Sequence, residues 1–383
     1  MKKILTLFTA LFILVQSMAQ KNMADSLGAL LVVEKQDSNR VTLLWNMANI
    51  SYNYNPDTAL LLSQQALHLA KKIKFTEGES RAIGIMANTF LKIGNYPRAL
   101  EFYLQKLKIE EGRDNPRSLA SVVMNIGIVY VYQEEYRKAL PYYFEADSII
   151  YTNNVEDLKY NITLNLGDLY NRLNINDSAF FYFKKSLQLA VKQQDGDLTG
   201  ASMVGLGHSY FKQKNYSLAM QNYQGALPFL QAADDEDLFC EGAIGLAKLY
   251  EKLGSSDSAE YYARKTLLIS QKDGFLSWHL EAASFLKEHF KKLKKNDSAL
   301  AYTEQAQALK DSINSKERIR ESQILSSDEQ LRQSQLAESK QEAKAERFKQ
   351  LQLLFIGIFI PILFLLTLFL SRRRVHIKVV KGM

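Results

Sequence analysis

The chain has 383 residues, of which 47% are hydrophobic and 23% charged, so its composition excludes global disorder and suits one or two ordinary domains. The formal net charge is +7, but seven of the 48 basic residues lie within the first three and the last twelve positions. Without those seven, the basic residues equal the 41 acidic ones, and this balance argues against a nucleic-acid-binding surface.

Residues 1–19 have the pattern of a secretory signal peptide. A basic start precedes an apolar run over residues 4–15, and small residues stand three and one before a cleavage point at Gln20. A membrane span is the weaker alternative, because about 12 apolar residues rise only ~18 Å along a helix. We therefore expect cleavage before Gln20 and a lead-in helix over residues 20–39.

From residue 40 onward one pattern repeats every 40 residues. Seven alanines recur at this spacing, with an aromatic residue or Ile nine residues before each, and the five inner units also hold Gly or Ala twelve residues before the alanine. In chain order the alanines are Ala59, Ala99, Ala139, Ala179, Ala219, Ala259 and Ala299, and the small residues are Ala87, Gly127, Gly167, Gly207 and Ala247. Apolar residues at helical spacing on both sides of a tight turn predict two helices per unit.

A small residue, an aromatic three later and an alanine nine after that resemble the tetratricopeptide repeat family. The resemblance covers residues 40–312 and implies an all-α fold, a right-handed α-α superhelix of seven hairpins of about 40 residues each. The usual period of that family is about 34 residues, so we expect each helix to be longer by nearly a turn. Met47 and Lys287 replace the small residue in the outer units, as capping repeats often do.

Four units carry an acidic residue two positions before the alanine, at Asp57, Asp177, Asp257 and Asp297. Each is followed by Ser or Thr at the expected start of a second helix, where a short acidic side chain can accept a backbone N–H and complement the helix dipole. The same dipeptide also occurs at Asp25, Asp147 and Asp311. It resembles an O-glycosylation acceptor of exported bacterial proteins, and this alternative stays open.

Catalytic chemistry has no visible place in the sequence. The five histidines are scattered over different units, and no metal-binding pair, nucleophile elbow or phosphate loop occurs. The single cysteine, Cys240, lies in a helical stretch and is expected to be a buried core thiol. We therefore predict a protein that is not an enzyme and that needs no cofactor or metal.

The resemblance places the candidate partner-binding residues on the first helices, which line the concave side of such solenoids. They are Asn88, Lys92, Tyr132, Asp168, Asn171, Arg172, His208, Lys212, Glu251 and Lys252. Aligned along the groove, the basic ones would form a ladder suited to an acidic segment or a terminal carboxylate. Alternatively, Lys or Arg in a last helical turn only offsets the dipole, and His208 is a packing residue. These residues do not reproduce the family's carboxylate-clamp pattern.

Residues 313–349 lack Gly and Pro and are rich in Glu, Lys, Gln and Arg, which favours a long charged helix. Its apolar residues keep no sustained heptad, so both a coiled-coil homodimer and a solvated spacer stay open.

Residues 350–371 predict a transmembrane helix, because residues 351–370 are uncharged and almost entirely apolar. The basic tail at 372–383 marks the cytoplasmic side. We therefore expect a single-pass protein of the bacterial inner membrane, with most of the chain periplasmic and the C-terminus cytoplasmic.

This organisation resembles the input half of bacterial tetratricopeptide-repeat sensor proteins, in which a kinase or a helix-turn-helix domain usually follows the span. The thirteen residues after residue 370 are too few for either domain. The predicted function is a membrane-anchored, extracytoplasmic scaffold or orphan sensor that binds a protein or peptide. The alternative is the input half of a signalling protein, a truncated relative of sensor kinases or regulators, that acts through dimerisation or a partner.

Overall fold

The computed structural model describes residues 30–52 and 55–313, together with Leu27, Lys344, residues 346–354 and Phe359. The chain divides into two compact units, Met1–Glu321 and Ser322–Met383. The predicted signal peptide, most of the charged helix and the basic tail lie outside the described residues. So does most of the predicted span, and within the described part no helix combines the length and apolarity that a membrane crossing requires.

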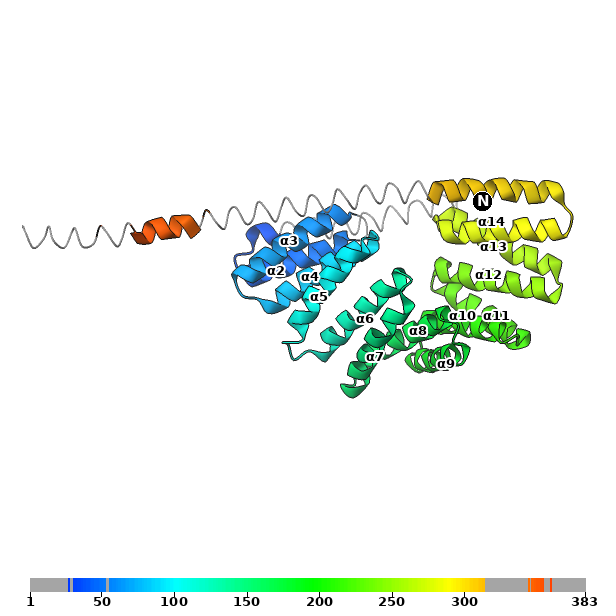
Figure 1. The fold of residues 1–383 in the computed structure, drawn as a ribbon, viewed down its shortest axis with the longest axis horizontal. Helices are drawn as coiled ribbons and strands as arrows, with labels where there is room; N and C mark the ends of the chain where they lie inside the picture. Colours follow the sequence, from blue (N-terminus) through cyan, green and yellow to red (C-terminus); the bar gives the residue numbers. More distant parts are fainter. Residues whose placement is uncertain are drawn as a thin grey trace, which may run out of the picture. The chain divides into compact units, whose positions relative to one another are not determined.

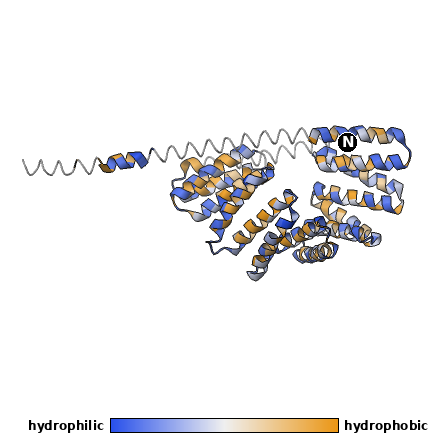
Figure 2. Cartoon of the chain, in the orientation of Figure 1, coloured by the Kyte–Doolittle hydropathy of each residue, from blue (hydrophilic) through white to orange (hydrophobic). Residues whose placement is uncertain are grey.

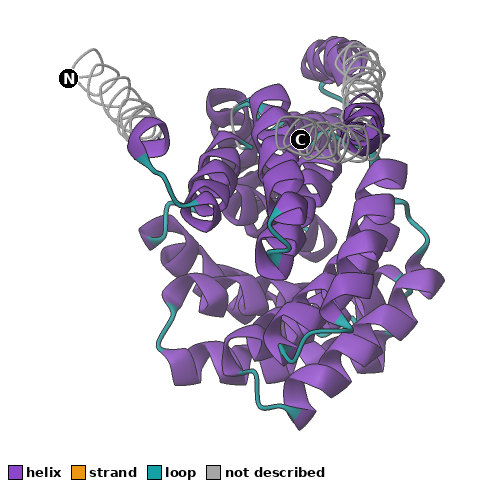
Figure 3. Cartoon of the chain, turned by 90° about the vertical axis from the view of Figure 1, so that its left-hand side faces the viewer, coloured by secondary structure: helices purple, strands orange, loops and turns teal. Residues whose placement is uncertain are grey.

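The first unit is built of helices, and its described residues contain no strand (Figure 3). The labelled helices are α2 (Asp37–Ser51), α3 (Pro56–Lys72), α4 (Thr76–Lys92), α5 (Tyr96–Glu110), α6 (Pro116–Tyr132), α7 (Tyr136–Thr152), α8 (Glu156–Arg172), α9 (Asn176–Gln193), α10 (Gly196–Lys212), α11 (Tyr216–Ala232), α12 (Glu236–Leu253), α13 (Ser256–Asp273) and α14 (Leu276–Lys292). Residues 30–33 and 296–313 are also helical, whereas residues 34–36 interrupt the described part of the predicted lead-in helix.

Within residues 37–313 the helices pair as seven hairpins, from α2 with α3 to α14 with the helix at 296–313. Each hairpin packs on the next in chain order, so the hairpins of this unit follow one another in a curved row (Figure 1). First helices of neighbouring hairpins also touch, as α8 touches α10 and α10 touches α12. Hydrophobic residues alternate with hydrophilic ones along these helices (Figure 2). The predicted ordered stack of hairpins is confirmed.

Both kinds of turn, within and between hairpins, recur every 20 residues. The residues with positive φ mark this register, and they are Lys74, Gly94, Glu134, Asn154, Asn174, Gln194, Lys214, Asp234, Gly254, Gly274 and Lys294. The connection between α5 and α6, residues 111–115, departs from this register. Each 40-residue unit therefore consists of two nearly equal halves, and the labelled helices contain 15 to 18 residues.

Asparagine or aspartate caps several helices, but two positions earlier than the sequence suggested. Six side chains accept the backbone N–H three residues on, and they are Asn55, Asn95, Asn115, Asp195, Asn215 and Asp235. Asp57, Asp177 and Asp257 instead lie inside the first turn of α3, α9 and α13. The prediction that they occupy the cap position is wrong, because the helices begin earlier, but their charge still suits the dipole. Glycosylation of the neighbouring hydroxyls stays a prediction.

The repeated alanines form the centre of the stack. Six of the seven are at most 1% exposed, whereas Ala299 in the last hairpin is only partly buried. In three hairpins the small residue is Gly127, Gly167 or Gly207, and the aromatic residue four after the alanine packs on it. At Gly127, for example, a Cβ atom would lie 2.4 Å from the ring of Tyr143, so only glycine admits this ring position.

Stacked aromatic pairs hold the two helices of five hairpins together. The pairs are Phe90 with Phe102, Tyr130 with Tyr142, Tyr170 with Tyr182, Tyr250 with Tyr262, and Phe290 with Tyr302, with ring centroids 5.5 to 5.7 Å apart. The predicted role of the first-helix aromatic, which fills the gap between helices, is confirmed. In one hairpin Asn222 stands where the other hairpins have the second-helix ring. There the first-helix ring of Tyr210 contacts Phe180 edge-on instead, with ring centroids 5.2 Å apart.

The irregular connection after α5 contains a buried ionic cluster around Glu110, whose side chain is 0% exposed. Ser80 donates its hydroxyl to Glu110, Lys106 Nζ lies 3.4 Å from its Oε1, and Arg113 Nη1 lies 3.0 Å away. Burial would raise the pKa of Glu110, but the hydrogen bond from Ser80 and the nearby cations lower it below 4.5. The carboxylate is therefore ionised in the folded protein at neutral pH.

Candidate functional site

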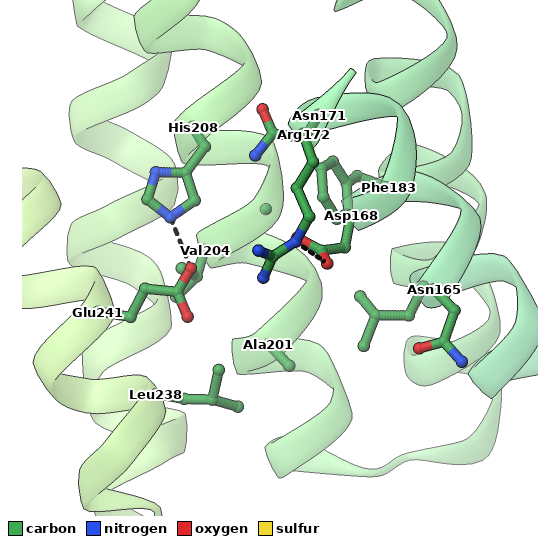
Figure 4. A pocket seen from close by; sticks show the side chains of 12 residues that line it. Asn165, Asp168, Asn171, Arg172, Phe183, Ala201, Val204, His208, Leu238 and Glu241 are labelled. Carbon is green, nitrogen blue, oxygen red and sulfur yellow. Dashed lines mark hydrogen bonds and ion pairs between the residues drawn. The ribbon is translucent and has the colours of Figure 1, made fainter. Parts of the chain in front are cut away.

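A hollow opens on the first helices of consecutive hairpins, α8, α10, α12 and α14. It has two adjoining parts with volumes of about 300 and 420 Å³, which we call the first lobe and the second lobe. Five residues line both lobes, and they are Asp168, Asn171, Arg172, His208 and Glu241 (Figure 4). Because all five stand on helices, the scaffold holds them more firmly than loops would.

The first lobe has an apolar wall formed by Leu164, Ala201, Val204, Leu238 and Phe183. Phe183 belongs to the second helix α9, yet its ring reaches between α8 and α10 to the hollow. It can do so because Gly167 and Gly205 have no side chains, since a Cβ atom there would lie 2.7 and 2.4 Å from the ring. The two glycines therefore open the floor of this lobe to an aromatic ring.

Phe183 differs from its counterparts in the four other inner hairpins, of which three have tyrosine and one has Ala263. The same position holds Tyr103, Tyr143 and Tyr223, each buried to within 3% exposure. The hydroxyl of Tyr103 donates to Asn88 Oδ1 at 2.5 Å, on the first helix of its own hairpin. Phe183 has no hydroxyl, so the floor of the first lobe presents no polar atom from this ring.

His208 joins the two lobes through hydrogen bonds on both ring nitrogens. Nε2 lies 2.9 Å from Oε1 of Glu241, and Nδ1 lies 2.7 Å from the hydroxyl of Tyr223. Since a carboxylate only accepts, Nε2 donates to Glu241, while Nδ1 shares the second hydrogen bond with the Tyr223 hydroxyl. Burial would raise the pKa of Glu241, but the bond from His208 and the charges of His208, Arg172 and Lys248 lower it.

Arg172 pairs with Asp168 on the same helix, with Nε 2.7 Å from Oδ2. Figure 4 shows the guanidinium of Arg172 and the carboxylate of Glu241 turned toward the same space. Burial opposes the charge of Arg172, but Asp168 and Tyr136 outweigh it, and the pKa of Arg172 is raised. Arg172 therefore stays charged with one face toward the hollow.

Lys212 and Asn171 form the polar edge between the lobes. The ammonium of Lys212 donates to the carbonyl oxygen of Asn171 at 2.8 Å and to Oδ1 of Asn174 at 3.2 Å. Burial lowers the pKa of Lys212, and the charge of Asp168 partly offsets this. Among the described residues, the buried Oδ1 of Asn171 has no hydrogen-bond donor.

The second lobe extends to α14 and is more strongly charged. Lys248 pairs with Glu281 across two hairpins, with Nζ 2.5 Å from Oε1. Trp278 also lines this lobe, and its indole N–H donates to Asp237 at 2.7 Å. The lobe therefore carries both signs of charge beside one large aromatic side chain.

The structure brings together half of the predicted groove residues. Asp168, Asn171, Arg172, His208 and Lys212 line the hollow. The other five line neither lobe, and they are Asn88, Lys92, Tyr132, Glu251 and Lys252. The partner-binding role of all ten stays a prediction.

The residues outside the hollow have structural contacts of their own. Lys92 lies 5.1 Å from the ring centroid of Tyr52, and the Tyr132 ring stacks on Tyr96 at 5.9 Å. Glu251 accepts from Lys292 of the next hairpin at 2.7 Å, so its carboxylate is already paired. Of the basic residues in the predicted ladder, Lys92 lies over a ring and Arg172 forms an ion pair, whereas Lys212 donates to neutral oxygens.

Sequence reasoning missed several residues of the hollow, chiefly Glu241, Lys248, Glu281 and Phe183. A signal existed for two of them, because Glu241 and Lys248 stand seven residues apart and hence on one face of α12. No signal from periodicity could have identified Phe183, which belongs to a second helix. Its place depends on missing side chains in two other helices.

The described residues contain no cluster of His, Cys, Asp or Glu that could hold a metal ion. Cys240 is fully buried, as predicted, and burial raises the pKa of its thiol to about 12. The hollow itself offers hydrogen bonds, charge and apolar contact.

Comparison with known families shows that residues 82–117 match the model of the tetratricopeptide repeat. This segment covers one hairpin, from α4 through α5 into α6, and the other hairpins are built in the same way. Residues 82–117 thus match a tetratricopeptide repeat. The repeats of the chain are longer than usual because each half occupies 20 residues.

Among curated proteins, tetratricopeptide repeat protein 29 of Trypanosoma brucei brucei is 20% identical over 194 residues, which are 49% of this chain and 40% of that protein. The chain spans less than half the length of the curated relatives that it matches.

Two solved structures share the repeat fold. The apo form of the quorum sensor NprR from B. thuringiensis aligns with a TM-score of 0.61 at 14% identity, over 78% of this chain and 84% of that one. The Rap conjugation gene regulator of plasmid pLS20, in complex with the Phr* peptide, aligns with a TM-score of 0.54 at 15% identity, over 74% and 78%. At these identities the likeness concerns the fold alone.

Proposed function

We propose that the chain is a binding scaffold that holds a peptide or protein segment in the hollow over α8, α10, α12 and α14. One observation carries this proposal: polar side chains from consecutive repeats converge on a cavity with an apolar wall. Asn171 adds a buried acceptor for which the described residues supply no donor. A concave, largely apolar site with a few placed polar groups is the usual form of a binding pocket.

The solved neighbours support a peptide as the occupant. The pLS20 regulator is described in complex with the Phr* peptide, and another Rap protein in complex with competence and sporulation factor. Both share the repeat fold with this chain. A stack of first helices supplies an elongated surface, which suits an extended segment better than a compact small molecule.

The proposed location follows from the sequence. We propose a single-pass protein of the bacterial inner membrane, with the repeats outside and the basic tail at 372–383 inside. In this setting the scaffold has no catalytic role of its own. Signalling through dimerisation or a partner is the second candidate, and the regulator NprR, with the same repeat fold, favours it.

The test compares two lysines that are two residues apart. The immobilised full chain is screened with a phage-displayed library of random peptides, and enriched peptides are then measured as synthetic probes. Lys212→Glu, in the hollow, should weaken their binding at least about tenfold, because a reversed charge repels a group that the lysine attracts. Lys214→Glu, in the following turn, is the matched control and should bind normally. Equal binding by both variants, or no enrichment at all, would contradict the proposal.

A further inference from the structure

We propose that the first lobe takes one large apolar side chain of a bound peptide, and that Lys212 receives a carboxylate of the same peptide. This inference rests on the function proposed above and names the residue types that the hollow selects.

The first part of the inference, that the first lobe binds a large apolar side chain, rests on the residues of its wall. Leu164, Ala201, Val204, Leu238 and the ring of Phe183 line it, and the volume is about 300 Å³. This is near the lower end of the range for ligand pockets, roughly 300–1,000 Å³, and suits one side chain better than a whole cofactor. Tyrosine stands at the position of Phe183 in three other hairpins, so this lobe has an aromatic ring without the hydroxyl that those rings carry.

The second part of the inference, that Lys212 binds a carboxylate of the peptide, rests on the cations of the hollow. Arg172 already has Asp168 at 2.7 Å, and Lys248 already has Glu281 at 2.5 Å. Lys212 instead donates to two neutral oxygens, and no carboxylate of the described residues lies within 4.0 Å of its ammonium. A carboxylate from a ligand would therefore form the charge-assisted bond that the chain itself leaves unmade.

Asn171 connects the two positions, because it lines both lobes and its carbonyl holds Lys212. Its buried Oδ1 lacks a donor within the described part of the chain. A peptide that fills the first lobe and reaches Lys212 in the second therefore passes over Asn171. The apolar and the acidic residue would then be close neighbours in the peptide.

The experiment uses the same phage-displayed random library and the full chain. Enriched peptides should share Leu, Ile, Met or Phe close to Asp or Glu. A synthetic enriched peptide and its analogue with the acid changed to the amide are then titrated by fluorescence anisotropy.

Three variants test the apolar first lobe and the carboxylate-binding Lys212 separately. Phe183→Tyr should weaken binding about tenfold by placing a hydroxyl against the apolar side chain, and it should melt like the original chain because tyrosine is packed equivalently elsewhere. Ala201→Met narrows the lobe at a partly exposed position, so it should shift selection toward smaller apolar residues. Lys212→Gln should weaken the acidic peptide and leave the affinity of the amide analogue unchanged.

The outcomes separate this inference from the proposed function. If enriched peptides lose affinity for Lys212→Glu but bind Phe183→Tyr and Ala201→Met like the original chain, the apolar position is overturned and the scaffold function stands. Equal loss of both the acidic peptide and its amide analogue in Lys212→Gln overturns the carboxylate position. A library without any enrichment overturns both the inference and the proposed function.

Discussion

At the scale of single residues, the absence of a side chain decides where the aromatic rings of the stack lie. Gly127 admits the Tyr143 ring, and Gly167 with Gly205 admits Phe183. Each ring from a second helix thereby reaches the first helices, and in one hairpin it reaches the hollow. A glycine inside a helix normally costs about 1 kcal/mol relative to alanine. Here close packing of a large ring compensates for that cost.

We expect Gly127→Ala to destabilise the protein by about 1–3 kcal/mol, because its Cβ would overlap the Tyr143 ring at 2.4 Å. Gly112→Ala is the control, since the nearest atom to its Cβ is a carbonyl oxygen at 3.6 Å. The control should change the free energy of unfolding by no more than about 0.5 kcal/mol. Urea denaturation followed by circular dichroism compares the two, and equal stability would refute the packing argument.

Two carboxylates of α5 differ in burial and in the number of their partners, and we therefore compare their removal. Glu110→Ala removes the acid from a buried cluster and should cost about 3 kcal/mol, because two cations and a hydroxyl lose their partner. Glu101→Ala breaks an exposed pair with Arg98 and should cost no more than about 1 kcal/mol. Similar midpoints of urea denaturation for both variants would show that the buried Glu110 contributes no more to stability than the exposed Glu101.

The same carboxylate predicts a pH dependence with a definite sign. The pKa of Glu110 is lower in the folded than in the unfolded protein, so its contribution to stability is fully present above about pH 4.5. It is lost as the pH falls through the folded pKa. The difference in unfolding free energy between the original chain and Glu110→Ala should therefore shrink below pH 4.5. A constant difference from pH 7 to pH 3 would contradict this assignment.

At the scale of elements, the regular spacing of the turns gives the chain its 20-residue period. Most turns place one residue at positive φ, and eight of these residues in the described chain are not glycine. Such residues are strained by about 1–2 kcal/mol each, which the packing of the helices on both sides must offset. The turn geometry is therefore imposed by the stack rather than by the turn residues.

Glu134→Gly should stabilise the protein by about 0.5–1 kcal/mol, because φ is +59° and glycine adopts this conformation without strain. Gln133→Gly, one residue earlier with φ of −81°, should destabilise it by a similar amount, because glycine relieves no strain at negative φ and loses more backbone entropy on folding. Thermal unfolding measures both. A loss of stability in Glu134→Gly would mean that its side chain, not its backbone, holds the turn.

At the scale of the whole molecule, the proposed anchor at 350–371 predicts where the protein is found. After cell lysis the full chain should sediment with membranes and resist extraction by carbonate, because a span of this hydropathy inserts stably. Deletion of residues 350–383 should release the repeats into the soluble fraction of the same compartment. Recovery of the full chain as a soluble protein would refute the anchor.

Much of the first unit followed from the spacing of residue types. The 40-residue recurrence of Ala139 and its counterparts predicted paired helices, their order and their buried seam. The helix starts were misplaced, because Asp57 and its counterparts have the chemistry of a cap but stand two residues inside the helix. Propensity cannot separate these positions, since an acidic residue is favourable at both.

By itself the sequence determined the repeated hairpin, since a period along the chain records which face of each helix is buried. It also located Asp168 and His208 at equivalent positions of neighbouring units, 40 residues apart. Only the tertiary structure decided that Glu241 would bond His208 from 33 residues away, and that Phe183 would form the floor of a lobe. These relations depend on how closely neighbouring hairpins approach, and that distance is decided jointly by glycines and rings in different units.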